Sequence, residues 1–252
     1  MQAYGRVFAK VYNLLWNDFA DHVAPLIHDF YAATEPGQAH QPVLDLCCGT
    51  GRLSRYFLER DFRLVGLDLS EHMVAHARQN NLEFVVAQQA AFVQGDAANF
   101  EVAEKFGLTV STYDALNHLP DAESLQGCFQ SVFAALLEGG YFIFDLNTHV
   151  GLEHWNGITV RPGAEIYLIN RGMYDENTVR AWTKITGFVR DESGLYERFE
   201  ETVYNTVFAM ADVRAWLRAA GFGEVYYALE KDLSAPIENP EAQKRVYFVA
   251  QK

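Results

Sequence analysis

The segment VLDLCCGTGRLS, residues 43–54, places an apolar run directly before two glycines that are separated by one residue. A short apolar run that ends in turn residues is typical of a buried strand. Glycine permits backbone angles that other residues avoid, and it lets backbone N–H groups come close to a ligand. A metal ion, a reactive thiol, a phosphate group and a nucleoside are each compatible with such a turn, so the rest of the chain has to distinguish them.

Strand and helix patterns alternate between residues 43 and 147. The expected strands are Val43–Cys47, Leu64–Asp68 and residues 91–96, 108–113 and 141–147; the expected helices are Arg52–Glu59, residues 71–79 with Ser70 as N-cap, and residues 121–137, closed by Gly139–Gly140. Residues 80–90 fit either a longer helix or another strand. Because the expected strands are apolar on both faces, they predict a parallel sheet covered by helices. The expected fold class is α/β, with a Rossmann-like, doubly wound and mostly parallel sheet.

Two other segments depart from this alternation. Residues 4–33 have helical spacing, with Pro25 expected to open or kink a second helix, and residues 34–42 look like a linker. Residues 158–206 alternate as antiparallel strands; within them TVRAWTKITGFVR carries Val179, Ala181, Ile185 and Val189 on one face and Arg180, Trp182, Lys184 and Phe188 on the other. We therefore expect N-terminal helices, a main domain of residues 1–149 and 207–252, and an inserted antiparallel sheet, residues 150–206, that covers the substrate or forms a dimer contact.

The charge of the chain limits its partners. It carries 33 acidic and 20 basic side chains, a formal net charge of −13, and no block of Lys and Arg. Such a chain repels polyanions, so neither nucleic acid nor an anionic membrane is an expected partner. No apolar run approaches the roughly 18 residues of a membrane-spanning helix, and MQAYGRVFAK lacks the layout of a secretory signal. Three cysteines without a Cys-x-x-Cys pair indicate a reducing, cytoplasmic location.

The adjacent Cys47 and Cys48 favour packing over chemistry. Neighbouring cysteines cannot easily reach one zinc ion, and no second Cys or His pair stands at ligand spacing, so no metal is expected. A thiol nucleophile would need a partner base that the sequence does not identify. A Walker phosphate loop would need Gly-Lys-Ser or Gly-Lys-Thr, which is absent. Two interpretations of the turn from Gly49 to Gly51 therefore stay open. It is either a tight connection between a strand and a helix or part of a nucleoside-binding site.

Acidic residues stand at the ends of the next two expected strands. Asp68 ends RLVGLDLS, where nucleoside-binding sheets place the carboxylate that holds the ribose hydroxyls, and Asp96 follows VQG. Each acid alone is more typical of a surface cap or turn. Ligands bind beyond the carboxyl ends of parallel strands, so the glycine turn and both acids converge on one crevice. This combination favours a nucleoside-binding site.

On these residues, between about 40 and 147, the chain resembles the class I S-adenosylmethionine-dependent methyltransferases. LDLCCGTG resembles their first motif, VGLDLSEHMVAHAR the second, VQGDA the third and LLEGGYFIFD the motif of the fifth strand. The aromatic N-terminal helices and the late insertion are similar to those of small-molecule N-methyltransferases of the amino-sugar and glycine/sarcosine types. The resemblance implies S-adenosylmethionine as cofactor and in-line transfer of its methyl group to a small-molecule acceptor, with an amine nitrogen as the expected acceptor atom.

The resemblance also implies roles for the matching residues. The cofactor-binding set comprises Asp45, Gly49 and Gly51 along the methionine portion, Asp68 on both ribose hydroxyls, Leu69 and Met73 around the adenine, Asp96 and Ala97 at the adenine amino group, and Thr112 and Tyr113 at the cofactor's own amino group. The long stretch between the two acids departs from the family's pattern and leaves the start of the third strand open.

Two segments supply candidates for the chemistry. In YDALNHLPD, His118 is expected to orient or deprotonate the acceptor, or else to cap the next helix, and Asn117 is a substrate-binding candidate or a turn former. Tyr4 and Tyr12 share one face of the first helix. They are expected either to pack in the core or to form a lid, with Tyr4 at the cofactor carboxylate and Tyr12 as a catalytic candidate.

The insertion is expected to set substrate choice. Trp155, Arg171 and Trp182 are candidates for the acceptor pocket, or else they pack within the inserted sheet; a homodimer through the insertion is the other expectation. Two alternative classes share a nucleoside crevice. A nicotinamide-dependent oxidoreductase is disfavoured because Ser54 stands where its third glycine would be. A non-catalytic S-adenosylmethionine-binding module stays open, since the binding residues are better defined than the chemical ones.

Overall fold

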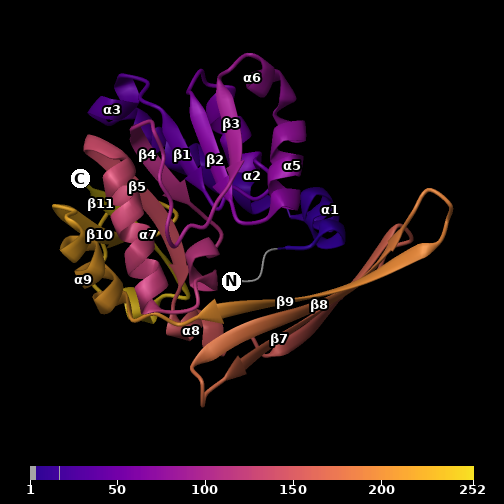
Figure 1. The fold of residues 1–252 in the computed structure, drawn as a ribbon. Coiled ribbons are helices and arrows are strands. Elements are labelled where there is room, and N and C mark those ends of the chain that lie inside the picture. The colour runs from indigo at the N-terminus through magenta and orange to yellow at the C-terminus, as the bar shows by residue number, and fades with distance from the viewer. Residues whose placement is uncertain (1–3, 17) are drawn as a thin grey trace.

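The computed structural model describes residues 4–16 and 18–252, and its centre is a seven-stranded sheet (Figure 1). The strands are β1 (Val43–Leu46), β2 (Leu64–Asp68), β3 (Ala90–Gln94), β4 (Phe106–Ser111), β5 (Leu136–Asn147), β10 (Glu224–Ala228) and β11 (Arg245–Gln251). They lie in the order β10–β11–β5–β4–β1–β2–β3. The strands from β5 to β3 pair in parallel, whereas β11 runs antiparallel to β5 and β10. The expected Rossmann-like, mostly parallel α/β fold is confirmed.

Helices cover both faces of this sheet and create two apolar cores. One core contains α2 (Asp18–Ala32), α4 (Arg52–Leu58) and α5 (Glu71–Asn80), and the other contains α7 (Ala122–Ala135), α9 (Met210–Ala220) and the 3-10 turn η1 (Ala115–His118). Successive strand residues alternate between the cores, since Val43 belongs to the first and Leu44 to the second. Among the described residues, no helix is long and apolar enough to span a bilayer.

Side-chain caps start the helices that follow strands at the expected positions. The Ser70 hydroxyl accepts a hydrogen bond from the Met73 N–H group at the start of α5. Asp121 accepts one from the Ser124 N–H group, at 2.8 Å, at the start of α7. Such caps satisfy backbone donors that have no partner within the helix. Both helices therefore begin where the sequence predicts.

Four details differ from the sequence-based expectations. Pro25 lies inside α2 and does not open it, because the helix begins at Asp18 and packs apolar side chains on both sides of the proline into the core. Residues 34–42 contain the short helix α3 (Glu35–Gln38), and residues 80–90 contain the short helix α6 (Leu82–Val86). Gly139–Gly140 lie within β5, not after α7, because the chain enters the strand directly from the helix and the β4–β5 register shifts there.

The insertion forms a second, antiparallel sheet, as expected. Its strands are β6 (Gly157–Arg161), β7 (Ile166–Asp175), β8 (Arg180–Arg190) and β9 (Tyr196–Thr206), paired in that order; α8 (His149–Glu153) precedes it, and η2 (Pro240–Ala242) follows in the main domain. Figure 1 shows its far end projecting from the rest of the molecule. The helix α1 (Arg6–Leu15) packs on one face of this sheet, where Phe8 and Val11 join Leu168, Ile185 and Phe199 in a third apolar cluster.

Candidate active site

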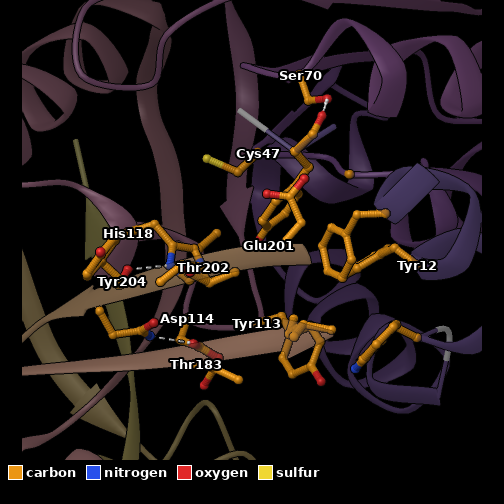
Figure 2. A pocket seen from close by; sticks show the side chains of 18 of the residues that line it. Tyr12, Cys47, Ser70, Tyr113, Asp114, His118, Thr183, Glu201, Thr202 and Tyr204 are labelled. Carbon is orange, nitrogen blue, oxygen red and sulfur yellow. Dashed lines mark hydrogen bonds between the residues drawn. The ribbon is translucent and has the colours of Figure 1, made fainter. Parts of the chain in front are cut away.

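A cavity of about 560 Å³ lies where the carboxyl ends of β1, β2 and β4 meet α1 and the inserted sheet (Figure 2). The carboxyl ends of parallel strands are where open α/β sheets bind ligands. The volume falls in the range of about 300–1,000 Å³ that is typical of sites for small molecules and cofactors. This cavity is therefore the candidate active site, and its walls come from both sheets.

Asp68, at the end of β2, is held in place at one side of the cavity. Its Oδ2 atom accepts a hydrogen bond from the Gly49 N–H group and its Oδ1 atom one from the Ser70 N–H group, both at 2.9 Å. Burial raises the pKa of this carboxyl, and the two backbone hydrogen bonds oppose the rise. Each oxygen keeps further acceptor capacity. This geometry suits a pair of neighbouring hydroxyl groups, as in ribose.

The two glycines of the first turn have different surroundings. Both have left-handed backbone, with φ of 53° at Gly49 and 75° at Gly51. A Cβ atom on Gly49 would meet only Tyr12, at 3.8 Å, and Gly49 lines the cavity. A Cβ atom on Gly51 would come within 2.6 Å of Asn81 Nδ2 and 3.2 Å of the Ala77 backbone, because α4 packs closely on α5. Gly51 therefore lies outside the cavity lining and serves helix packing.

The remaining residues of this turn lie beside or beneath the cavity. Asp45 is buried, and its carboxylate accepts a hydrogen bond from the Ser54 hydroxyl at 2.5 Å. Burial raises the pKa of Asp45 to about 7, against the effect of that hydrogen bond. Cys47 lines the cavity and Cys48 packs in the core, and burial raises the pKa of both thiols well above the ordinary value. Protonated thiols are poor nucleophiles, which favours packing roles for both cysteines.

A strained turn at the end of β4 forms another part of the wall. Tyr113 and Asp114 both have left-handed backbone, with φ of 65° and 50°. Such residues are uncommon outside glycine and have to be held by their surroundings. Asp145 in β5 accepts hydrogen bonds from both backbone N–H groups, at 2.7 and 2.9 Å. Arg245 in β11 forms ion pairs with Asp145 and, at 2.7 Å, with Asp114. This buried network fixes the turn.

His118, at the end of η1, lines the cavity as expected. The dashed line in Figure 2 joins its ring to the backbone carbonyl of Tyr204, which lies 2.8 Å from Nδ1. A carbonyl oxygen only accepts hydrogen bonds, so Nδ1 carries the proton and Nε2 of the neutral ring is the basic nitrogen. The charge of a protonated His118 would lower the pKa of Asp68, which places the two groups within electrostatic reach of each other.

Aromatic rings of α1 and the segment before it close the cavity. Tyr4 and Tyr12 both line it, and their rings stack with centroids 6.3 Å apart. Burial raises the pKa of both phenols well above 10, and the nearby carboxylates of Asp114 and Asp68 raise it further. Both hydroxyl groups therefore stay protonated at neutral pH. Tyr12, a catalytic candidate from the sequence, is available as a hydrogen-bond donor but not as a base.

Polar contacts tie this lid to both sides of the site. On one side the Ser70 hydroxyl donates a hydrogen bond to the Tyr4 carbonyl, at 2.7 Å. On the other side Glu201 in β9 accepts a hydrogen bond from the Gly5 N–H group, at 2.8 Å. Arg6 of α1 also pairs with Glu197 in β9, and Asn13 accepts a hydrogen bond from Asn80 in α5, both at 2.7 Å. The lid is therefore tied to α5 and to the inserted sheet.

Two of the residues expected at the adenine lie elsewhere. Asp96 is exposed, and its Oδ1 atom accepts a hydrogen bond from the Ala98 N–H group at 2.9 Å. Ala97 is buried in the core beneath α7. Neither residue lines the cavity, whereas Leu69 and Met73 do. The cavity therefore brings together Leu69 and Met73, while the Asp96 carboxylate stabilises its own turn; the adenine contacts of all four residues stay a prediction.

Three of the expected acceptor-binding residues also lie outside the cavity lining. Asn117 is fully buried; its side chain bonds to the backbone of Asn147 and donates to the Thr206 carbonyl, so it joins η1 to β5 and β9. Arg171 and Trp182 belong to the outer face of the inserted sheet, because the strand alternation puts Ala181 and Ile185 on the inner face. Trp155 does line the cavity.

A glycine turn, a carboxylate held by two backbone N–H groups and a strand-end cavity are the features of a nucleoside-binding α/β protein. Residues 43–140 match the family model described as a methyltransferase domain. An uncharacterised methyltransferase of Synechocystis is 31% identical over 64% of this chain and 68% of its own length. The dTDP-3-amino-3,4,6-trideoxy-alpha-D-glucopyranose N,N-dimethyltransferase of Streptomyces venezuelae is 26% identical over 86% of this chain and 91% of its own.

The fold comparison extends over nearly the whole chain. The crystal structure of an S-adenosylmethionine-dependent methyltransferase from Clostridium acetobutylicum superimposes with a TM-score of 0.80 at 22% identity, covering 97% of both chains. The chain belongs to the class I S-adenosylmethionine-dependent methyltransferases, and S-adenosylmethionine is its cofactor. Asp68, Gly49, Leu69 and Met73 fit this cofactor because they line the strand-end cavity together.

The sequence analysis did not identify three residues of the site, Asp114, Asn205 and Arg245, which all line the cavity. Asp114 stands within the quoted YDALNH segment but carries no spacing signal of its own. Arg245 lies about 130 residues further along the chain, and only the sheet order brings it beside β5. Asp145 could have been noticed, because it follows a run of apolar strand residues, as Asp68 does.

Proposed function

We propose that this methyltransferase transfers the methyl group to the nitrogen of a small amine. The observation that supports this most is the lining of the cavity beyond Asp68. Carboxylates of Asp114 and Glu201 and the stacked rings of α1 surround that space. Carboxylates and aromatic faces favour cationic groups and their precursors. The positive charge of Arg245 does not cancel the negative charge of this region, because Arg245 pairs with the carboxylates of both Asp114 and Asp145.

The proposed chemistry assigns separate tasks to the residues of the site. The bound cofactor supplies an electrophilic methyl group on a positively charged sulfur. As the acceptor nitrogen forms its N–C bond, the S–C bond would break and S-adenosylhomocysteine would leave, and Nε2 of His118 would accept the proton that the nitrogen releases. Tyr4 and Tyr12 close the site and offer hydroxyl donors. Positioning alone contributes about 7–11 kcal/mol in well-oriented reactions, and a general base adds a factor of about 10²–10⁴.

The test is a screen of the purified protein with S-adenosylmethionine and matched amines, alcohols, phenols and thiols. We expect S-adenosylhomocysteine and an N-methylated product, identified by mass spectrometry, only in the presence of amines. His118→Ala should lower turnover by about 10²-fold and leave the dissociation constant of the cofactor unchanged. His154→Ala is the control, since this exposed histidine lies outside the cavity. Transfer exclusively to oxygen or sulfur would contradict the proposal.

We also propose a cytoplasmic location. All three cysteines, Cys47, Cys48 and Cys128, are free thiols, and two of them are buried. Free thiols persist in reducing compartments. Fractionation of the producing cell with antibody detection would test this, and recovery from a secreted or periplasmic fraction would contradict it.

A further inference from the structure

The inner face of the inserted sheet turns polar side chains toward the cavity. Asn170 in β7, Thr183 in β8, and Glu201 and Asn205 in β9 all line it. Asn205 pairs with Ala181 and Glu201 pairs with Ile185 in the sheet register, so these side chains share the face that packs on α1. Figure 2 shows Thr183 and Glu201 on the two strands that form this wall. The acceptor side of the cavity is therefore polar, although the sheet behind it is held by apolar contacts.

The amide of Asn205 has one defined orientation. Its Nδ2 atom lies 2.9 Å from Oδ2 of Asp114, while Oδ1 of Asp114 is paired with Arg245 at 2.7 Å. An ionised carboxylate only accepts hydrogen bonds, so the amide nitrogen has to face it and the amide oxygen has to point away. The network of Arg245 and Asp114 thus engages the amide nitrogen of Asn205. The amide oxygen, Oδ1, is the atom that can accept a hydrogen bond from another group.

That remaining atom has no donor. Asn205 is fully buried, and among the described residues none donates a hydrogen bond to its Oδ1 atom. The Oδ1 atom of Asn170 is also buried, and within the part of the chain that the structure describes no group donates a hydrogen bond to it. A buried acceptor without a donor is unfavourable unless a ligand or a water molecule supplies one. Both residues line the cavity, so a ligand bound in the cavity is the nearest candidate donor for these oxygens.

We propose that Oδ1 of Asn205 and Oδ1 of Asn170 are two separate recognition points for the methyl acceptor, each receiving a hydrogen bond from a different hydroxyl or amino group. In the register Asn170 lies opposite Ile185 and Asn205 lies opposite Ala181, so a single small donor group reaches only one of them. The proposal rests on the proposed function and narrows it. The methylated nitrogen loses N–H bonds as it reacts, so lasting donors have to come from other groups. The substrate class is accordingly an amino alcohol or another amine with additional donors, and simple alkylamines are poor ligands.

The experiment compares matched amines by isothermal titration calorimetry on the protein loaded with S-adenosylhomocysteine. The probes are 2-, 3- and 4-aminocyclohexanol, with cyclohexylamine as the compound that lacks the hydroxyl group. One hydrogen bond to a buried acceptor should make at least one amino alcohol bind about threefold to tenfold more tightly than cyclohexylamine. This preference should disappear in the variant that lacks the oxygen met by the hydroxyl group, either Asn205→Ala or Asn170→Ala, while the affinities for cyclohexylamine and S-adenosylhomocysteine stay unchanged.

Two further variants complete the test. Asn170→Ala removes the second oxygen without touching the Asp114 network, so it remains informative if Asn205→Ala is unstable. Thr186→Ala is the matched control, because the register places Thr186 on the outer face of the same sheet. Equal affinities of all four probes in the wild type, no binding of any probe, or a preference that survives in both asparagine variants would overturn the proposal. Preferential binding without any N-methylation would contradict the proposed function and still support the subsite.

Discussion

At the residue scale, the glycine turn shows that one backbone conformation can have two causes. Gly49 and Gly51 are both left-handed, but the first faces the cavity and the second faces another helix. A left-handed residue other than glycine costs about 1–2 kcal/mol. At Gly51 the crowding by Asn81 and Ala77 adds to this strain, whereas at Gly49 an added methyl group would instead project toward the lid and the ligand.

The two alanine variants should therefore fail in different ways. Gly51→Ala should lower the free energy of unfolding by more than the roughly 1–2 kcal/mol of backbone strain and leave cofactor affinity of the folded protein unchanged. Gly49→Ala should lose less stability and bind S-adenosylmethionine more weakly. Urea unfolding and calorimetric titration measure the two quantities, with each variant serving as the control for the other. The reverse order of effects would contradict these roles.

Asp45 predicts a pH dependence of stability. Its pKa rises to about 7 in the folded state, so the folded protein holds this proton more tightly than the unfolded chain does. Stability from this group is therefore lost as the pH rises from about 4 to about 7. At 1.36 kcal/mol per pKa unit, the loss is at most about 4 kcal/mol. Asp45→Asn, which keeps the size of the side chain, should remove it.

Urea unfolding between pH 5 and pH 8 tests this expectation. The free energy of unfolding should fall more steeply with pH in the wild type than in Asp45→Asn. The control is Asp212→Asn, a change at an exposed position of α9. Parallel pH profiles of the wild type and Asp45→Asn would show that Asp45 does not couple folding to protonation.

At the element scale, α1 packs its apolar side chains on the insertion and not in the cores of the main sheet. Its apolar side chains join a cluster that is separate from the two main cores. Polar contacts tie the helix and the two residues before it to both parts of the chain, namely to Ser70 and Asn80 in the main domain and to Glu197 and Glu201 in the insertion. Elements with few buried contacts open locally at lower free energy than the core. The helix that closes the cavity is therefore the element best placed to admit the cofactor and the acceptor.

Val11→Ala tests this division. Val11 is fully buried against the inserted sheet and does not line the cavity. Losing two methyl groups should weaken the docking of α1 by about 2 kcal/mol. Hydrogen exchange followed by mass spectrometry should then show faster exchange in residues 6–15 and unchanged exchange in β1, β4 and β5. Val110→Ala, in the core of β4, is the control and should raise exchange throughout the main domain. Equal patterns for both variants would contradict a separately docked helix.

At the scale of the whole molecule, no layer formed by residues 4–16 and 18–252 covers the outer face of the inserted sheet. Exposed apolar side chains gather there by register: Ile158 (67% exposed), Val160 (49%), Tyr167 (36%) and Tyr204 (50%). On the same face Glu200 forms ion pairs with both Lys184 and Arg198, so one carboxylate is shared by two basic side chains. Sheets commonly bury such faces against another sheet about 10 Å away. We propose that a second copy of this chain packs there.

The double variant Ile158→Lys, Tyr167→Lys tests the dimer. It should convert the protein from a dimer to a monomer in analytical ultracentrifugation at micromolar concentration, because it places charges in an apolar contact. Leu195→Lys, at an exposed turn away from the face, is the control. A wild type that is monomeric throughout, or a double variant that remains dimeric, would contradict the proposal.

The cofactor half of this protein was largely predictable from its sequence. Apolar runs and helix caps specify β1, β2 and α5 locally, so the positions of Gly49, Asp68 and Met73 at strand and helix ends follow from short-range patterns. The role of Asp96 stays a prediction, because an acid after a strand and an acid in a turn have the same local pattern. The distinction depends on which side chains reach the crevice, and that depends on how neighbouring segments pack.

The acceptor half was decided by tertiary structure. Alternation correctly separates the two faces of β8, yet only the docking of α1 determines that the face of Ala181, not that of Trp182, is the inner one. Similarly, Arg245 and Asn205 reach Asp114 across 131 and 91 residues. The physical reason is that strand periodicity and capping act between residues near each other in the chain. Which surfaces meet is set instead by apolar burial and buried charge pairing between distant segments, which the order of residues alone does not display.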